Sequence, residues 1–241
     1  ADHEVIINLA GESVFKRWTR EAKKRILDSR VETTRNLVEA LSPDASGTTL
    51  VSTSAVGYYG FHGDEALDEG SPPGDDFLAS VCRQWEAGAM AARSKGARVV
   101  ICRFGIILGE RGGALQKMVP FFKKGLASPL GSGKQWVSWI HQEDLSHIYR
   151  ALLEERRDLS GPVNCTAPHP VTNKEMTQVL AEVLNRPAFM PAMPAFAVRS
   201  LMGESSSLYL KGQKVLPRRL TEAGFSFHFP ELKGALSGLD L

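Results

Sequence analysis

The chain has 241 residues, 43% of them hydrophobic, and its 29 basic and 27 acidic side chains give a formal net charge of +2. These values are ordinary for a globular protein with a substantial core, and we expect no nucleic-acid partner. No apolar run approaches the roughly 20 residues of a membrane span, so no membrane partner is expected. Cys82, Cys102 and Cys165 are widely separated and show no metal-binding spacing. They favour a reducing compartment, and the N-terminus lacks signal-peptide features, so we expect a cytoplasmic location.

Short apolar runs alternate with amphipathic stretches along the chain. The predicted strands cover residues 5–9, 48–52, 98–104, 136–141 and 162–166. The predicted helices cover residues 18–41, 77–94, 115–126 with an interruption at Pro120, 143–155, 172–184 and 196–202. Thr172 is the expected N-cap of its helix. Strands that alternate with helices and are joined by glycine turns predict an α/β fold with a parallel sheet.

The composition changes at Pro187, after which prolines precede a short apolar helix. The remaining tail is too short to build a strong core of its own. We therefore expect a main domain over residues 1–186 and a small, mostly helical C-terminal cap over residues 187–241.

A group of hydroxyl side chains follows the second predicted strand. Ser54, Tyr58 and Tyr59 lie in the stretch Val-Ser-Thr-Ser-Ala-Val-Gly-Tyr-Tyr-Gly. In open α/β sheets, ligands bind outside the carboxyl ends of the strands, so these three residues are the candidate catalytic groups. A Ser/His/Asp hydrolase using His141 and Asp144 is an alternative, but no Gly-x-Ser-x-Gly motif surrounds Ser54.

The sequence gives less support to a glycine-rich phosphate-binding loop or to a metal site. The residues as given contain neither of the common glycine-rich phosphate-binding motifs. His62, Asp64 and Glu65 share a loop, but no second ligand cluster has matching spacing, so no metal site is predicted. Arg103 ends a predicted strand, where it has two interpretations: a partner for an acidic or phosphate ligand, or half of a buried ion pair.

Several stretches, taken in order, resemble the extended short-chain dehydrogenase/reductase superfamily. They are Asn8-Leu9-Ala10-Gly11, Ser52-Thr53-Ser54-Ala55 with Tyr58-Tyr59-Gly60, Arg103-Phe104-Gly105-Ile106-Ile107-Leu108-Gly109, and Trp139-Ile140-His141-Gln142-Glu143-Asp144-Leu145. The chain is most similar to an atypical branch, the nucleoside-diphosphate-sugar-epimerase-like proteins with a C-terminal domain of unknown function. Two further stretches typical of that branch are Gly131-Ser132-Gly133-Lys134-Gln135 and Gly212-Gln213-Lys214-Val215-Leu216-Pro217.

The resemblance implies a Rossmann-like NADP-binding domain. It assigns family cofactor contacts to Leu9, Ala10, Gly11, Arg30 and Ile107. An ion pair between Arg30 and Glu32 on the helix surface is the alternative for that arginine. The expected function is an NADP-linked oxidoreductase or a sugar-nucleotide-epimerase-like protein acting on an unidentified small molecule. The alternative is a non-catalytic dinucleotide-binding sensor or scaffold.

Two departures from the family pattern qualify this expectation. The residues as given begin at a later strand than the family's glycine-rich loop, so we expect a sheet incomplete in its N-terminal half. We also expect weak or no NADPH binding by this chain, and an exposed sheet edge at residues 5–9 through which it forms a homo-oligomer.

The family's Tyr-x-x-x-Lys pair falls on Phe77 and Val81, or one residue later on Leu78 and Cys82. Neither register supplies a phenol or an amine, so Tyr58 or Tyr59 would have to act as the acid.

Overall fold

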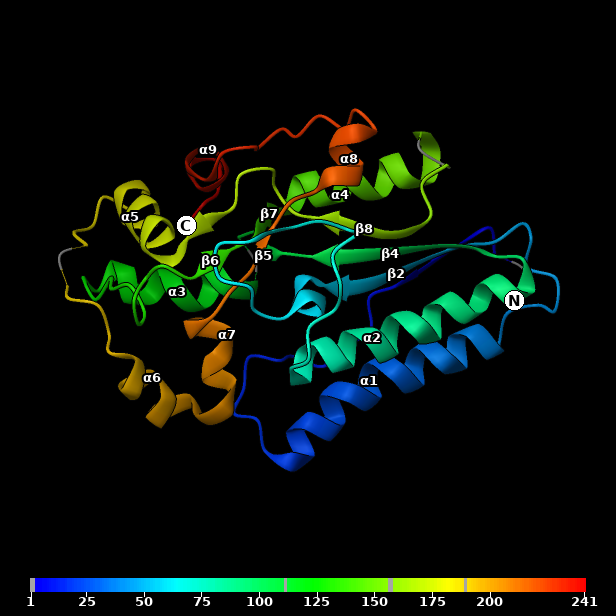
Figure 1. Ribbon diagram of the computed structural model, residues 1–241. Helices are drawn as coiled ribbons and strands as arrows, with labels where there is room; N and C mark the ends of the chain where they lie inside the picture. Colours follow the sequence, from blue (N-terminus) through cyan, green and yellow to red (C-terminus); the bar gives the residue numbers. More distant parts are fainter. Residues whose placement is uncertain (1–2, 111, 156–157, 189) are drawn as a thin grey trace.

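The computed structural model describes residues 3–110, 112–155, 158–188 and 190–241 (Figure 1). Its strands are β1 (Val5–Asn8), β2 (Thr49–Ala55), β3 (Ala66–Leu67), β4 (Arg98–Phe104), β5 (Ile106–Leu108), β6 (Trp136–Val137), β7 (Trp139–His141), β8 (Gly161–Cys165), β9 (Val171–Thr172) and β10 (Lys214–Val215). Its α-helices are α1 (Arg20–Glu39), α2 (Phe77–Met90), α3 (Gly113–Lys123), α4 (Gln142–Arg150), α5 (Asn173–Val183), α6 (Ala195–Met202), α7 (Ser207–Leu210), α8 (Arg218–Glu222) and α9 (Leu232–Ser237).

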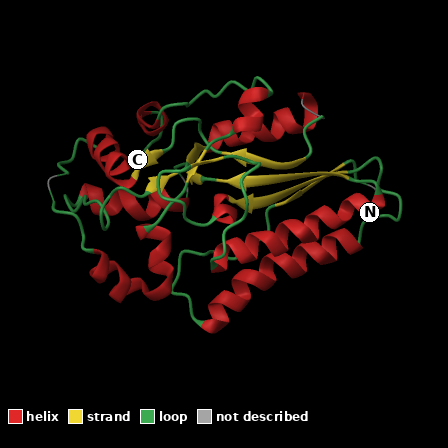
Figure 2. Ribbon diagram, viewed as in Figure 1, coloured by secondary structure: helices red, strands yellow, loops and turns green. Residues whose placement is uncertain are grey.

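The centre of the fold is a parallel sheet in the order β1-β2-β4-β8. Helices α1 and α2 cover one face, whereas α4 and α8 cover the other (Figures 1 and 2). Strand β4 shows why the sheet is buried on both sides. Its Val99 and Ile101 pack in the cluster that contains residues of α1 and α2, while Val100 and Cys102 pack toward α4. The predicted α/β Rossmann-like fold is confirmed.

Strand β1 forms one edge of this sheet in the described part of the chain. Its side chains alternate as a strand requires, so that Asn8 is buried while Val5 and Ile7 are 42% and 45% exposed. The exposed apolar edge predicted at residues 5–9 is therefore present. A homo-oligomer formed through it remains a prediction.

The C-terminal residues pack directly onto the main unit. Strand β10 pairs in parallel with β3, and Leu232 and Leu236 of α9 join the core cluster around Trp139 and Leu180. The tail is mostly helical, as expected, and its hydrophobic side chains complete a core supplied by the earlier residues. No helix among the described residues is both long and apolar enough to cross a membrane.

Two expectations about local structure were wrong. Strand β2 runs to Ala55, so Ser54 lies inside the strand and not beyond its end. Pairing with β4 continues as far as Ala55 opposite Phe104, and this long-range contact extends the strand. Helix α3 continues through Pro120 because Leu115, Val119 and Phe122 bury one face of it. That packing outweighs the hydrogen bond that the proline cannot donate.

Candidate functional site

The Ser54 hydroxyl is hydrogen-bonded to a buried ion pair between Glu86 and Arg103. This hydroxyl donates a hydrogen bond of 2.6 Å to Oε1 of Glu86 on α2. The same carboxylate accepts bonds of 2.9 Å from Nε and 2.8 Å from Nη2 of Arg103, the β4 residue paired with Ser54. Arg103 is 3% exposed. Of the two interpretations of Arg103, the structure therefore bears out the buried ion pair.

The interactions between Arg103 and Glu86 favour the charged form of Arg103. Burial alone would lower the pKa of Arg103, but the hydrogen bonds and negative charge of Glu86 outweigh burial and raise it. Because the proton of the Ser54 hydroxyl points to Glu86, the lone pairs of Oγ remain available on its other sides. Ser54 is thus set to accept a hydrogen bond from a ligand in this state.

The two tyrosines surround Arg103 instead of facing open space. Tyr59 is fully buried, and its hydroxyl donates to Asn164 Oδ1 at 2.6 Å and accepts from Arg103 Nη1 at 2.9 Å. The Tyr58 ring lies over the guanidinium, with Cζ of Arg103 3.5 Å from the ring centroid. Burial raises the pKa of Tyr59 from 10.0 to about 12. The three candidate catalytic residues are therefore brought together at Arg103, but both tyrosines have structural partners there.

We expect Tyr59→Phe to lower the free energy of unfolding by about 1–3 kcal/mol at neutral pH, because it deprives Asn164 Oδ1 and Arg103 Nη1 of their hydrogen bonds to the Tyr59 hydroxyl. The wild-type protein should also lose stability as the pH rises from about 10 to about 12. In that window the unfolded chain ionises this phenol while the folded chain keeps it protonated. Urea denaturation across this pH range measures both effects.

Tyr58→Phe is the matched control, because it keeps the ring over Arg103 and should change stability by less than about 0.5 kcal/mol. Tyr149, whose pKa is also raised by burial, adds to the alkaline loss. The Tyr59 contribution is therefore the difference between the wild type and Tyr59→Phe. Equal stability of the two Phe variants would contradict a structural role for the Tyr59 hydroxyl.

A cavity of about 730 Å³ opens beside Ser54. Its wall is mostly apolar and aromatic, with cationic side chains at three positions. The wall includes Gly11, Arg30, Thr53, Ser54, Leu78, Cys82, Trp85, Phe104, Ile107, Lys117, Gln135, Trp136, Asn173, Tyr209, Lys211 and Gln213. Of the three candidate catalytic residues, Ser54 alone lines it.

Three of the five predicted cofactor residues reach this cavity, namely Gly11, Arg30 and Ile107. Leu9 is 64% exposed and Ala10 is half-buried, and neither is part of the wall. The backbone at this point is fixed by Asn8, whose Oδ1 accepts the amide proton of Ala10 at 3.2 Å.

Hydrogen bonds hold the Arg30 guanidinium at the cavity wall, where it can contact a ligand. Its Nη1 donates to the carbonyls of Glu12 and Ile26 at 3.0 Å each, and Cζ lies 5.1 Å from the Trp85 ring centroid. A Cβ at Gly11 would lie 3.0 Å from Arg30 Cζ, so glycine leaves room for this close approach. Burial lowers the pKa of Arg30. The described residues show no ion pair between Arg30 and Glu32, the alternative suggested by the sequence.

The structure also shows where the residues that align with the family's Tyr and Lys lie relative to the cavity. Leu78 and Cys82 both line the cavity, whereas in the other register Val81 lines it but the Phe77 ring packs outside it, with its centroid 5.2 Å from that of the Trp18 ring. The register on Leu78 and Cys82 is therefore the one with both positions in the cavity wall. Burial raises the pKa of the Cys82 thiol to about 11, so the thiol is protonated at neutral pH. Neither residue offers the phenol or amine that the family reaction uses.

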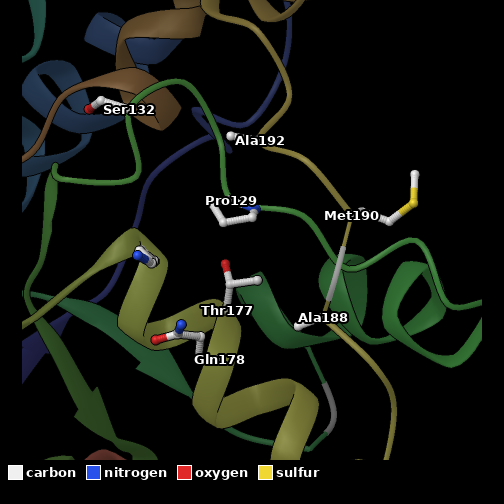
Figure 3. A pocket seen from close by; sticks show the side chains of 8 residues that line it. Pro129, Ser132, Thr177, Gln178, Ala188, Met190 and Ala192 are labelled. Carbon is white, nitrogen blue, oxygen red and sulfur yellow. The ribbon is translucent and has the colours of Figure 1, made fainter.

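The other candidates from the sequence have partners elsewhere. His141 accepts the amide proton of Glu143, and both Asp144 oxygens accept backbone N–H groups, so neither residue serves Ser54 as a triad partner. In the loop with His62, Asp64 accepts a bond from Trp136 Nε1 at 2.8 Å. A smaller pocket of about 310 Å³ lies between α5 and a segment that includes Ala188, Met190 and Ala192 (Figure 3). It lacks a convergent set of titratable groups.

Sequence reasoning missed the contributions of Trp85, Lys117, Tyr209 and Lys211, because no local pattern shows that these distant elements meet. For other residues of the cavity wall, the sequence did contain a signal. Gln135, Gly212 and Gln213 belong to the stretches that resemble the family branch, and all three line the cavity. Gly212 is required sterically, since a Cβ there would lie 1.9 Å from the Trp136 carbonyl oxygen.

Two family models match this chain. The NAD dependent epimerase/dehydratase family matches residues 1–165, and a domain of unknown function (DUF1731) matches residues 193–239. The chain belongs to the NAD dependent epimerase/dehydratase family. Relatives include the chloroplastic epimerase family protein SDR39U1 homolog of Arabidopsis thaliana, 47% identical over 97% of this chain and 67% of that protein. Another is Bacillus subtilis YfhF, 40% identical over 98% of this chain and 78% of that protein.

A solved structure of this family is also similar over nearly the whole chain. The crystal structure of human SDR39U1 with NADPH matches with a TM-score of 0.91 and 36% identity, covering 99% of this chain and 82% of that one. A nucleoside-diphosphate sugar epimerase from Corynebacterium glutamicum matches with a TM-score of 0.78 and 34% identity, covering 97% of this chain and 45% of that one. The predicted resemblance to an epimerase family with a C-terminal domain of unknown function is thus confirmed. The cytoplasmic location remains a prediction, and one relative is named chloroplastic.

Proposed function

We propose that this protein is an NADPH-linked oxidoreductase whose substrate is a mostly apolar small molecule with an acidic group. The observation that carries the proposal is the shared cavity: Ser54, three of the five family cofactor positions and an aromatic wall surround the same space. A cavity of this size with a few convergent polar groups is typical of small-molecule sites.

The residues on the cofactor side fit a dinucleotide. Arg30 presents a fixed cation, Gly11 leaves room beside it, and Ile107 offers an apolar surface. The NADPH bound by the human relative supports the choice of cofactor. When bound, NADPH would supply a hydride. The weak or absent NADPH binding expected for this chain remains a prediction, and a fluorescence titration with NADPH measures it.

The polar side chains of the wall use only part of their hydrogen-bonding capacity within the protein. Asn173 Oδ1 accepts from the Leu130 amide at 2.8 Å, and Gln213 Nε2 donates to the Val56 carbonyl at 3.2 Å. Gln135 Nε2 donates to backbone carbonyls as well, whereas Gln135 Oε1 is buried without a partner among the described residues. The preference for an apolar substrate therefore rests on the mostly apolar and aromatic wall, where sugar hydroxyls would lose hydrogen bonds to water on entry.

The cationic side chains suggest where an acidic group would bind. Lys117 Nζ lies 5.0 Å from the Phe15 ring centroid, and Lys211 Nζ lies 5.1 Å from that of Phe61. Both lysines line the cavity, and both lie beside aromatic surface. A carboxylate on an otherwise apolar molecule would complement this combination.

Ser54 and Glu86 are the groups we propose for proton handling. A substrate hydroxyl in the cavity can donate to Ser54 Oγ, while the Ser54 proton is already directed to Glu86 at 2.6 Å. In the oxidation direction, a substrate hydroxyl would pass its proton to Ser54 as Ser54 passes its own to the Glu86 carboxylate. In the reduction direction, the same path would run in reverse, and Glu86 would take up the required proton from solvent and deliver it through Ser54 to the new hydroxyl. This path would take the place of the acid and base that Leu78 and Cys82 cannot supply.

The test is NADPH consumption by this chain, followed by absorbance, with two panels of substrates: aromatic or aliphatic keto acids and sugar nucleotides. We expect turnover with the apolar acids. Ser54→Ala should lower kcat by roughly 100-fold or more, and Lys117→Met should raise KM about tenfold. Lys124→Met, which changes an exposed lysine outside the cavity wall, is the control. Turnover confined to sugar nucleotides would contradict the proposed substrate.

A second candidate is a non-catalytic dinucleotide-binding module. The observation that favours it is the presence of Leu78 and Cys82 at the two aligned positions in the cavity wall. NADPH binding without turnover in either panel would support this alternative and would overturn the oxidoreductase.

A further inference from the structure

Outside the cavity, three potential metal ligands converge at the start of α4. They are Glu143 and His147 of α4 and His228 of the C-terminal segment, and one ligand atom from each lies within 4.8 Å of the others. His228 Nδ1 is 3.6 Å from Glu143 Oε1, and the two imidazole ring centroids are 4.4 Å apart. None of the three residues lines the 730 Å³ cavity. The cluster is therefore separate from the proposed reaction site.

The backbone holds these side chains in place. Glu143 and His147 are four residues apart on a helix and so share one face. Asp144, which is fully buried, accepts the amide protons of His228 at 2.8 Å and Phe229 at 2.9 Å. This carboxylate fastens the segment that carries His228 to the helix that carries the other two ligands. The third ligand is consequently positioned before any metal binds.

The ligand chemistry points to a transition metal. Two imidazoles and one carboxylate are a common set for Zn²⁺, with a fourth position left to water, whereas Mg²⁺ and Ca²⁺ prefer oxygen ligands throughout. His147 Nδ1 is buried and has no hydrogen-bond partner in the described part of the chain. Buried polar atoms are normally paired, so an unpaired nitrogen on one imidazole of the cluster is a second indication that a partner is missing.

We propose that Glu143, His147 and His228 form a zinc site that joins the C-terminal segment to α4. Bound zinc would add a second link between the C-terminal segment and α4, beside the hydrogen bonds from the His228 and Phe229 amides to Asp144. Its role would be structural, since the site lies outside the cavity, and it does not depend on the function proposed above.

The test uses untagged protein stripped with a chelator and titrated calorimetrically with ZnCl₂. We expect a single zinc to bind per chain and to raise Tm by roughly 5–10 °C at a hundredfold excess over Kd. MgCl₂ should give no shift. His147→Ala and His228→Ala should each weaken zinc binding at least about tenfold. His228→Ala leaves the backbone amide bonded to Asp144 in place, so the segment should stay attached.

His169→Ala is the matched control. His169 is also an exposed histidine beside one carboxylate, with Nε2 3.5 Å from Glu231 Oε1, but it lacks a third ligand among the described residues. It should keep wild-type zinc affinity. Cobalt substitution adds an independent readout, because tetrahedral Co²⁺ gives intense visible absorption that the double variant His147→Ala/His228→Ala should lack. Equal zinc affinity in the wild type and this double variant, or no zinc binding by the wild type, would overturn the proposal.

Discussion

Replacing Arg103 with methionine should lower the free energy of unfolding by about 3–5 kcal/mol, the usual cost of removing one partner from a buried ion pair. Methionine fills similar space but leaves the Glu86 carboxylate buried without its two charged hydrogen bonds. It also removes the donor to Tyr59 and the cation beneath the Tyr58 ring. Urea denaturation measures the loss.

Arg218→Met provides the control, because Arg218 is 64% exposed while it contacts Asp68 and Glu222. Exposed ion pairs contribute little, so its loss should cost less than about 1 kcal/mol. Adding Glu86→Leu to Arg103→Met should recover part of the stability, since it removes the unpaired charge. Equal costs for Arg103→Met and Arg218→Met would contradict a central role for the buried pair.

Replacing Arg30 with methionine should weaken NADPH binding by roughly 10- to 100-fold, the equivalent of losing a hydrogen bond to a charged group. Arg30 lines the cavity with its guanidinium on Trp85, and methionine keeps an apolar side chain there while removing the charge. NADPH fluorescence titration measures the ratio of the two dissociation constants, which is informative whatever the absolute affinity.

Lys24→Met is the control for this experiment. Lys24 lies on the same helix but its side chain is 74% exposed and pairs with Asp28, away from the cavity. Its replacement should leave NADPH affinity unchanged. Similar dissociation constants for the wild type and Arg30→Met would remove Arg30 from the cofactor site.

Local patterns predicted those parts of the fold that depend on neighbouring residues. The Thr172 N-cap is present with a full capping box, because Glu175 returns a bond to the Thr172 backbone. The strand at Arg98–Phe104 is also as predicted, since a continuous apolar run is typical of a strand buried on both faces. By contrast, the end of β2 depends on pairing with β4, which no local pattern reveals.

The candidate site was predictable in part. The sequence predicted candidate catalytic groups in the stretch after the second strand, and the contacts that these groups make depend on residues distant in sequence. Glu86 lies in an alanine-rich helical stretch, and nothing local indicates that it bonds both Ser54 and Arg103. The burial of Tyr59 depends likewise on Asn164 of β8. The resemblance to a family supplied Gly11, Arg30 and Ile107, which composition and periodicity alone do not identify.

We expect a dinucleotide and an apolar substrate to meet in the cavity beside Ser54. A crystal structure of this protein at a saturating concentration of NADPH tests it most directly. We predict nucleotide in contact with Gly11 and Arg30, with the space lined by Phe104 and Trp136 left open for substrate. Nucleotide bound away from Gly11, Arg30 and Ser54, or a cavity that stays empty when NADPH is bound in solution, would contradict the account.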